Sequence, residues 1–169
     1  TLEDAAGNKH VLNKFMSKEA TPRPESYRED LATAAAVQVP NRRERVLSEI
    51  AAAAESGWDF SSRWLEDGQS LHTAYTSELL PVDLNSIMYR FEANMQRLSL
   101  MVGDEGGAAS FGAAAHRRQL AMREVMWDEA RRQWLDVQWR SGTPASPRMT
   151  TAANWLPLWA GCFDARQAR

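Results

Sequence analysis

Three short segments place charged side chains beside prolines, glycines and aromatic rings: residues 22–26, 56–64 and 80–86. In the second, Asp59 lies among Trp58, Phe60 and Trp64, which are expected to bury it. A carboxyl group can donate a proton at neutral pH when its pKa is raised, and burial against aromatic rings has that effect. The segment therefore fits acid–base chemistry, while N-capping of a short helix over residues 60–62 is the alternative that the residues alone favour.

The first segment offers a binding clamp. Arg23 and Glu25 flank Pro24, which holds them in register. A guanidinium and a nearby carboxylate can hold neighbouring hydroxyl groups through paired hydrogen bonds. The alternative is a local ion pair at a helix start, with Glu25 stabilised by the helix dipole, and the residues do not decide between the two. Gly57 allows a ligand to approach the main chain closely, and it serves equally well to end a helix.

Two predicted helices position these segments. A residue before a proline avoids helical angles, so residues 22–24 are extended and a helix begins at residue 25 or 26 and runs through Ala36. Asn41 is the predicted N-cap of a second helix, which ends near Ser56, before the glycine. The loop of residues 58–64 follows directly and is expected to be packed and lined with polar groups.

The most regular helix is predicted further along the chain. Asp83 is its expected N-cap, and apolar residues at helical spacing carry it to Val102. After a turn over residues 103–107, an alanine-rich helix is expected over residues 108–127. Its basic face is expected to be solvated and consists of Arg117, Arg118 and Arg123.

Irregular segments make up the remainder. Residues 1–21 are interpreted as a loop with a turn at Gly7, residues 134–139 as a short strand and residues 141–147 as a turn-rich loop. The last helix is expected over residues 150–168, with a kink or restart at Pro157 because proline lacks a backbone donor. No set of strands could build a sheet. The predicted fold class is therefore all-α, with helical hairpins in series that can close into a toroid.

Composition excludes several classes of function. With 20 lysines and arginines against 22 aspartates and glutamates, the net charge of −2 gives no field that would hold nucleic acid. No apolar run approaches the ~20 residues that a membrane span needs. The single Cys162 and the three scattered histidines have no metal-ligand spacing, so no metal is expected. Seven tryptophans are many for 169 residues, and flat rings at a polar site suit the faces of sugars.

The three segments, in this order and with the helix of residues 45–55 between them, resemble the middle of the trehalase family of inverting glycosidases. The similarity continues more weakly at residues 89–92, 127–129, 139–141 and 152–158. The resemblance implies a six-hairpin (α/α)6 toroid, of which this chain forms a part. It also implies hydrolysis of α,α-trehalose to two glucose molecules, with no metal or organic cofactor.

The same resemblance assigns roles to individual residues. Asp59 corresponds to the general acid, which protonates the glycosidic oxygen while a second carboxylate, about 6.5–9.5 Å away, activates a water molecule. Arg23, Glu25 and Gly57 correspond to sugar-binding positions, and Pro24 holds the first two in register.

Two parts of the family pattern have no counterpart in the chain. The glutamate that serves as catalytic base is expected beyond Arg169, and a glycine-rich signature is expected upstream of Thr1. Two matched positions also depart from the family: residues 13–16 lack the larger aromatics, and residues 136–138 lack a second aspartate. Residues 1–169 are therefore predicted to be a single incomplete domain, the central part of a catalytic domain, and to be inactive alone.

The resemblance further predicts a full-length protein that is a monomer, binds trehalose, and binds neither nucleic acid nor membranes. It favours a periplasmic or extracellular location and leaves a cytoplasmic one open. Two alternatives remain: a related toroidal α-glucosidase with another substrate, and a degenerate helical fragment that binds sugar without turnover. Hydrolysis rates across disaccharides test the first, and sugar binding without glucose release would support the second.

Overall fold

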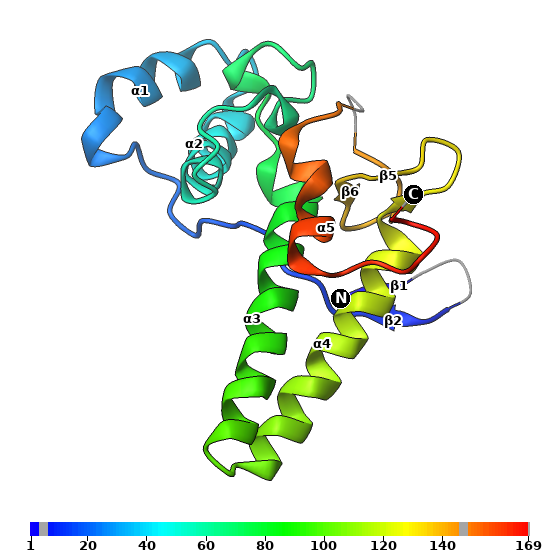
Figure 1. Cartoon of the computed structure of the whole chain (residues 1–169). Coiled ribbons are helices and arrows are strands. Elements are labelled where there is room, and N and C mark those ends of the chain that lie inside the picture. The colour runs from blue at the N-terminus through cyan, green and yellow to red at the C-terminus, as the bar shows by residue number, and fades with distance from the viewer. Residues whose placement is uncertain (4–6, 146–148, 169) are drawn as a thin grey trace. The chain divides into compact units, whose positions relative to one another are not determined.

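The computed structural model describes residues 1–3, 7–145 and 149–168 (Figure 1). The chain divides into two compact units, which are described separately. Unit 1 comprises Thr1–Asn13, Leu80–Pro144 and Thr150–Arg169, and unit 2 comprises Lys14–Leu79 and Ala145–Met149. Whether the two belong to a single incomplete domain, as the sequence predicts, stays a prediction.

Unit 2 holds the two helices predicted to flank the charged segments. Its elements are the 3-10 turn Pro24–Ser26, α1 Tyr27–Ala35, α2 Pro40–Glu55, the 3-10 turns Ser62–Trp64, Leu71–Thr73 and Thr76–Glu78, and, at its end, the first residue of β3 Leu79–Leu80. Both predicted helices are confirmed, but the predicted N-cap Asn41 is wrong. Val39 is the N-cap, because Pro40 occupies the first turn, where its missing N–H costs nothing.

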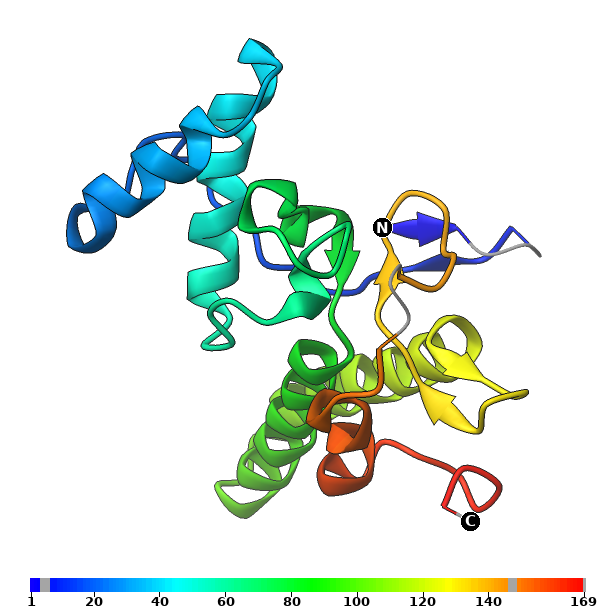
Figure 2. The same cartoon turned by 90° about the horizontal axis from the view of Figure 1, so that it is seen from above.

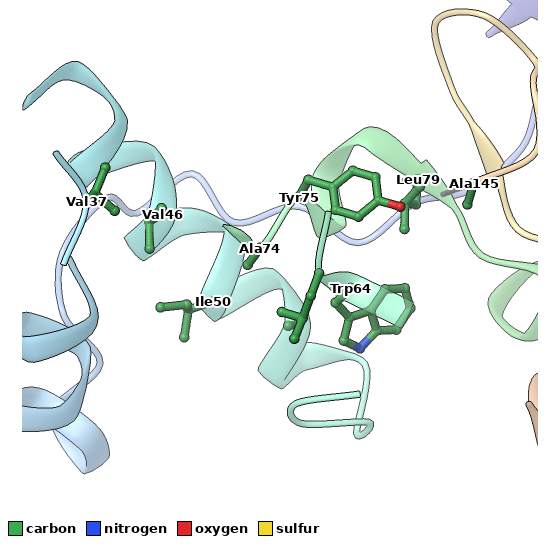
Figure 3. Packing of buried hydrophobic residues seen from close by; sticks show 10 residues of the cluster. Val37, Val46, Ile50, Trp64, Ala74, Tyr75, Leu79 and Ala145 are labelled. Carbon is green, nitrogen blue, oxygen red and sulfur yellow. The ribbon is translucent and has the colours of Figure 1, made fainter. Parts of the chain in front are cut away.

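The core of unit 2 fixes the start and the end of the loop between α2 and the turn Ser62–Trp64. Ile50 and Trp64 are fully buried members of this core (Figure 3). Ala53 is fully buried in the same cluster. The Trp64 ring packs edge-on against Phe15, with 6.2 Å between ring centroids. Its indole Nε1 donates a hydrogen bond to the Trp58 carbonyl at 3.1 Å. A core tryptophan therefore anchors this loop, which agrees with the packed loop that the sequence predicts over residues 58–64.

Unit 1 is built on a helical hairpin of α3 Val82–Met101 and α4 Glu105–Val125, which lie side by side (Figures 1 and 2). Gly103 adopts φ +78° in the turn, and Asp104 caps α4 by accepting a hydrogen bond from Gly107 N at 2.8 Å. The smaller elements are β1 Leu2–Glu3 paired with β2 Lys9–His10, β4 Trp127–Asp128 paired with β5 Gln133–Trp134, β6 Val137–Gln138, the 3-10 turn Ala152–Trp155 and α5 Leu156–Ala160.

Three predictions for unit 1 are corrected. Asp83 is not the N-cap of α3 but lies in its first turn, after Pro81. The last predicted helix, residues 150–168, is only the 3-10 turn followed by α5, because Gly161 adopts φ +78° and ends it. The expected restart at Pro157 is confirmed, since this proline lies in the first turn of α5. Arg118, expected in solvent, is buried with 7% of its surface exposed.

Candidate active site

Unit 2 contains all five residues that the sequence singles out as site residues. Arg23 stands just before the 3-10 turn that leads into α1, and Pro24 and Glu25 form the start of that turn. Gly57 follows the last turn of α2 with φ +72°, a left-handed conformation that disfavours other residues. Asp59 lies two residues later, in the loop before the turn Ser62–Trp64.

The Arg23 guanidinium is held by a carboxylate that the sequence analysis did not identify. Arg23 Nε donates to Asp30 Oδ2 at 2.9 Å and Nη2 donates to Asp30 Oδ1 at 2.8 Å, while the Arg23 backbone N donates to Oδ2 at 2.9 Å. The local ion pair expected between Arg23 and Glu25 is therefore replaced by one with Asp30. The signal available in the sequence was an aspartate inside the predicted helix, where a carboxylate needs a partner if it is buried.

Charge and ring contacts bring three of the predicted site residues together. The hydrogen bond to Asp30 is the largest cause that raises the pKa of Arg23; partial burial opposes it, and the charges of Glu25 and Asp59 add to the rise. The guanidinium also lies over the Phe60 ring, 5.1 Å from its centroid. Arg23 therefore links its own segment, residues 22–26, to the segment of residues 56–64 within unit 2.

The Asp59 loop is shaped by its own hydrogen bonds and by Arg63. Ser61 N and Trp64 Nε1 both donate to the Trp58 carbonyl, at 2.6 and 3.1 Å. Arg63, 3% exposed, lies over the rings of Trp58 and Trp64, with 5.3 and 4.3 Å to the centroids. These contacts order the loop from both ends.

Two expectations for Asp59 are tested by this geometry. The short helix it was to cap begins at Ser62, and its N-cap is Ser61, whose side chain accepts a hydrogen bond from Arg63 N. The capping alternative is therefore wrong. The expected burial is also wrong for the described part of the chain, since Asp59 is exposed and Trp64 turns into the core instead. Asp59 thus presents its carboxylate to solvent on an ordered loop.

The third charged segment belongs to unit 1 and has a structural role there. Asn85 is fully buried, and its side chain bonds to the main chain of Asn13 and Pro81 and to Arg118. Asp83 Oδ1 accepts a hydrogen bond from Leu84 N at 2.9 Å. Among the described residues no group of histidine, cysteine, aspartate and glutamate side chains could hold a metal ion.

Comparison with known proteins decides which family this arrangement belongs to. The sequence profile described as Trehalase matches residues 2–169. The chain belongs to the trehalase family. It is 37% identical over 159 residues to proteins named periplasmic trehalase from Salmonella newport (strain SL254) and Salmonella paratyphi C (strain RKS4594), covering 94% of this chain and 26% of each relative. This trehalase-family chain therefore spans about a quarter of the length of the curated relatives it matches.

Solved structures agree on the fold. The chain resembles neutral trehalase from Saccharomyces cerevisiae with a TM-score of 0.60 and 21% identity, covering 85% of this chain and 25% of that one. A mannosylglycerate hydrolase from Thermus thermophilus follows, with a TM-score of 0.51, 15% identity and coverage of 81% and 31%. These likenesses confirm the predicted fold class, an all-α partial (α/α)6 toroid. Among the helices that the structure describes, none could span a membrane.

Proposed function

We propose that the protein to which this chain belongs hydrolyses α,α-trehalose to two glucose molecules with inversion, and that Asp59 is the general acid. Membership of the trehalase family supports the reaction. The observation that carries the assignment of residues is the contact of Arg23 with Phe60, the residue after Asp59: the guanidinium lies 5.1 Å from the ring centroid. The charges of Glu25 and Asp59 also help to raise the pKa of Arg23. The exposed carboxylate of Asp59 on an ordered loop supports a role at a surface that a sugar can reach.

The reaction needs two carboxyl groups on opposite sides of the bond that breaks. As the proposed general acid, Asp59 gives a proton to the glycosidic oxygen as the carbon–oxygen bond breaks, and the first glucose leaves as an alcohol. A second carboxylate, about 6.5–9.5 Å away and supplied by a part of the protein outside this chain, takes a proton from the attacking water. The water oxygen bonds to the anomeric carbon from the opposite face, which inverts its configuration.

Arg23, Glu25, Pro24 and Gly57 are proposed to hold the glucose unit next to Asp59. A guanidinium and a carboxylate provide donors and acceptors for neighbouring hydroxyl groups. Pro24 keeps the two side chains at the start of the 3-10 turn. A Cβ built on Gly57 meets no atom within 4 Å, so the space beside its main chain is open to a ligand.

The test is Asp59→Asn in the full-length protein. We expect glucose release from trehalose to fall by about 10²–10⁴-fold or more, because the amide cannot supply an acidic proton. Thermal unfolding should be unchanged, since Asp59 is exposed. Glu55→Gln is the matched control, because this exposed carboxylate at the end of α2 should be neutral. Near-normal glucose release by Asp59→Asn would reject the assignment.

Substrate preference and location are proposed from the same resemblance. Trehalose should be hydrolysed at least tenfold faster than other α-linked disaccharides, and a faster rate on another disaccharide would replace trehalose as the substrate.

A periplasmic location is proposed because the similar Salmonella proteins are named periplasmic trehalases. Osmotic shock should release the protein with the periplasmic fraction, and retention in the cytoplasm would contradict this. The monomeric state is tested by light scattering of the full-length protein.

A further inference from the structure

We propose that Asp30 is a positioning residue for the sugar-binding site: it fixes the Arg23 guanidinium against the Phe60 ring so that one guanidinium nitrogen stays available for substrate. The proposal rests on the proposed function, and it adds a residue that no family motif quoted above contains. Asp30 lies in the first turn of α1 Tyr27–Ala35 and is 2% exposed, so it acts through Arg23 rather than on a substrate.

Among the residues that the structure describes, only Arg23 donates hydrogen bonds to the Asp30 carboxylate. Both of its oxygens accept from the Arg23 side chain, and Oδ2 also accepts from the Arg23 backbone N. The side chain and the main chain of Arg23 are therefore held by the same carboxylate. Burying a carboxylate costs free energy unless the carboxylate is paired and hydrogen-bonded. Asp30 therefore needs Arg23 as its partner, and Asp30 in turn orients the Arg23 guanidinium.

The geometry leaves one side of the guanidinium unused. Nε and Nη2 lie in the two parallel bonds to Asp30, at 2.9 and 2.8 Å, which fixes the plane and the rotation of the group. No hydrogen bond of the third nitrogen, Nη1, is found within residues 1–3, 7–145 and 149–168. The Arg23 side chain is 13% exposed. Nη1 can therefore give two donors to hydroxyl groups without breaking the pair.

The ring of Phe60 ties this oriented group to the loop of the proposed acid. The Arg23 Cζ lies 5.1 Å from the ring centroid, and a guanidinium over a ring face is stabilised by the ring quadrupole. Phe60 is the next residue after Asp59. Asp30, Arg23 and Phe60 thus form a clamp that sets the distance between a sugar-binding nitrogen and the acid.

A double-mutant cycle in the full-length protein tests whether Asp30 acts through Arg23. We expect Asp30→Asn to lower kcat/KM for trehalose by about 10²-fold, the scale seen when a binding group is misplaced by about 1 Å. Arg23→Ala should lose at least as much, and the double variant Arg23→Ala with Asp30→Asn should lose no more than Arg23→Ala alone. Losses that multiply would overturn the proposal.

Chemical rescue separates positioning from a purely structural role. Guanidinium ion at millimolar concentration should partly restore Arg23→Ala, because Asp30 can hold the free ion where the side chain was. The same ion should not restore the double variant. Equal rescue of both, or of neither, would contradict the proposal.

Phe60→Leu probes the other side of the clamp without disturbing the buried pair, and it keeps the test decisive if Asp30→Asn fails to fold. It should raise KM severalfold and leave thermal unfolding unchanged, and an unchanged KM would contradict the clamp.

A readout independent of activity separates this proposal from the proposed function. The Nη protons of Arg23 should give resolved NMR signals in the wild type and averaged ones in Asp30→Asn or, if that variant does not fold, in Asp30→Glu. A wild type inactive on trehalose would reject the proposed function, and averaged wild-type signals would reject the positioning role.

Discussion

Two bidentate arginine–carboxylate pairs, Arg118–Glu92 in unit 1 and Arg23–Asp30 in unit 2, differ in which guanidinium nitrogens have partners. In unit 1, Arg118 donates to both Glu92 oxygens at 2.9 and 2.7 Å, and its Nη1 donates to Asn13 Oδ1 and Asn85 Oδ1, each at 2.9 Å. Every nitrogen of that guanidinium is occupied within the described chain. In unit 2, Arg23 bonds to Asp30 through the same two nitrogens, and its Nη1 has no such partner among the described residues.

The difference teaches how to separate a structural arginine from a binding one. Both pairs are bidentate and both are largely shielded, with side-chain exposures of 8% and 11% for Arg118 and Glu92 and of 13% and 2% for Arg23 and Asp30. Burial therefore does not distinguish them. The Nη1 donor of Arg23 does distinguish them, because a buried network in which every donor and acceptor is already bonded cannot bind a ligand.

The largest expected effect is on stability, in unit 1. Glu92→Ala should lower the free energy of unfolding by about 3–5 kcal/mol, because it leaves the Arg118 charge buried without its carboxylate. Urea unfolding of the full-length protein checks this, followed by the fluorescence of its tryptophans. A loss below about 1 kcal/mol, the scale of an exposed pair, would mean that Arg118 is not the closed structural pair described above.

The next effect compares two glycines with the same backbone conformation in the two units. Gly57 and Gly103 have φ of +72° and +78°, and a Cβ at either meets no atom within 4 Å. Gly57→Ala and Gly103→Ala should each cost roughly 1–2 kcal/mol through backbone strain. Only Gly57→Ala should also raise KM for trehalose, because the proposed sugar contact lies there. Equal KM values for both variants would remove Gly57 from the site.

A smaller effect is expected in the pH dependence of stability. Burial raises the pKa of Asp30, but the hydrogen bonds from Arg23 outweigh it and hold this pKa below its ordinary value of 3.8. A carboxyl whose pKa is lowered on folding stabilises the protein above the unfolded pKa and loses that contribution as the pH falls through the folded one. The stability advantage of wild type over Asp30→Asn should be constant near neutrality and shrink below about pH 4. An advantage that grows on acidification would contradict the lowered pKa.

The smallest effect is expected where an ion pair is open to water. Arg42 and Glu66 approach to 3.6 Å with side-chain exposures of 61% and 65%. Glu66→Gln should change the free energy of unfolding by less than about 1 kcal/mol, because solvent and salt screen the pair. The same urea measurement that detects Glu92→Ala serves here, and a loss as large as that of Glu92→Ala would show that burial does not set the strength of these pairs.

Local signals predicted α1, α2, α3 and α4, because the signals for each of these helices lie in residues that are close together in sequence. The apolar spacing of residues 84–102 predicted α3, and Pro40 and Gly57 lie at the two ends of α2. The same spacing did not predict burial: Ile87, Phe91 and Leu98 are 48%, 52% and 49% exposed. A periodic row of apolar residues shows which face of a helix is apolar, but whether that face is buried depends on residues elsewhere in the chain or in the rest of the protein.

Partners far apart in sequence could not be predicted in the same way. Arg118 was expected in solvent because its partners Glu92 and Asn13 are 26 and 105 residues away. Asp30 was missed for a related reason, since seven residues and the start of a helix separate it from Arg23. The five proposed site residues came from motif resemblance, which carries residue identity but not the contacts that orient each side chain.

The most direct measurement of the central claim uses a substrate whose leaving group needs no proton. In the full-length protein, Asp59→Asn should lose trehalose hydrolysis by about 10²–10⁴-fold or more, yet hydrolyse α-glucosyl fluoride within about tenfold of the wild-type rate, because fluoride departs without general-acid help. That split would identify Asp59 as the proton donor. An equal loss on both substrates would contradict the account.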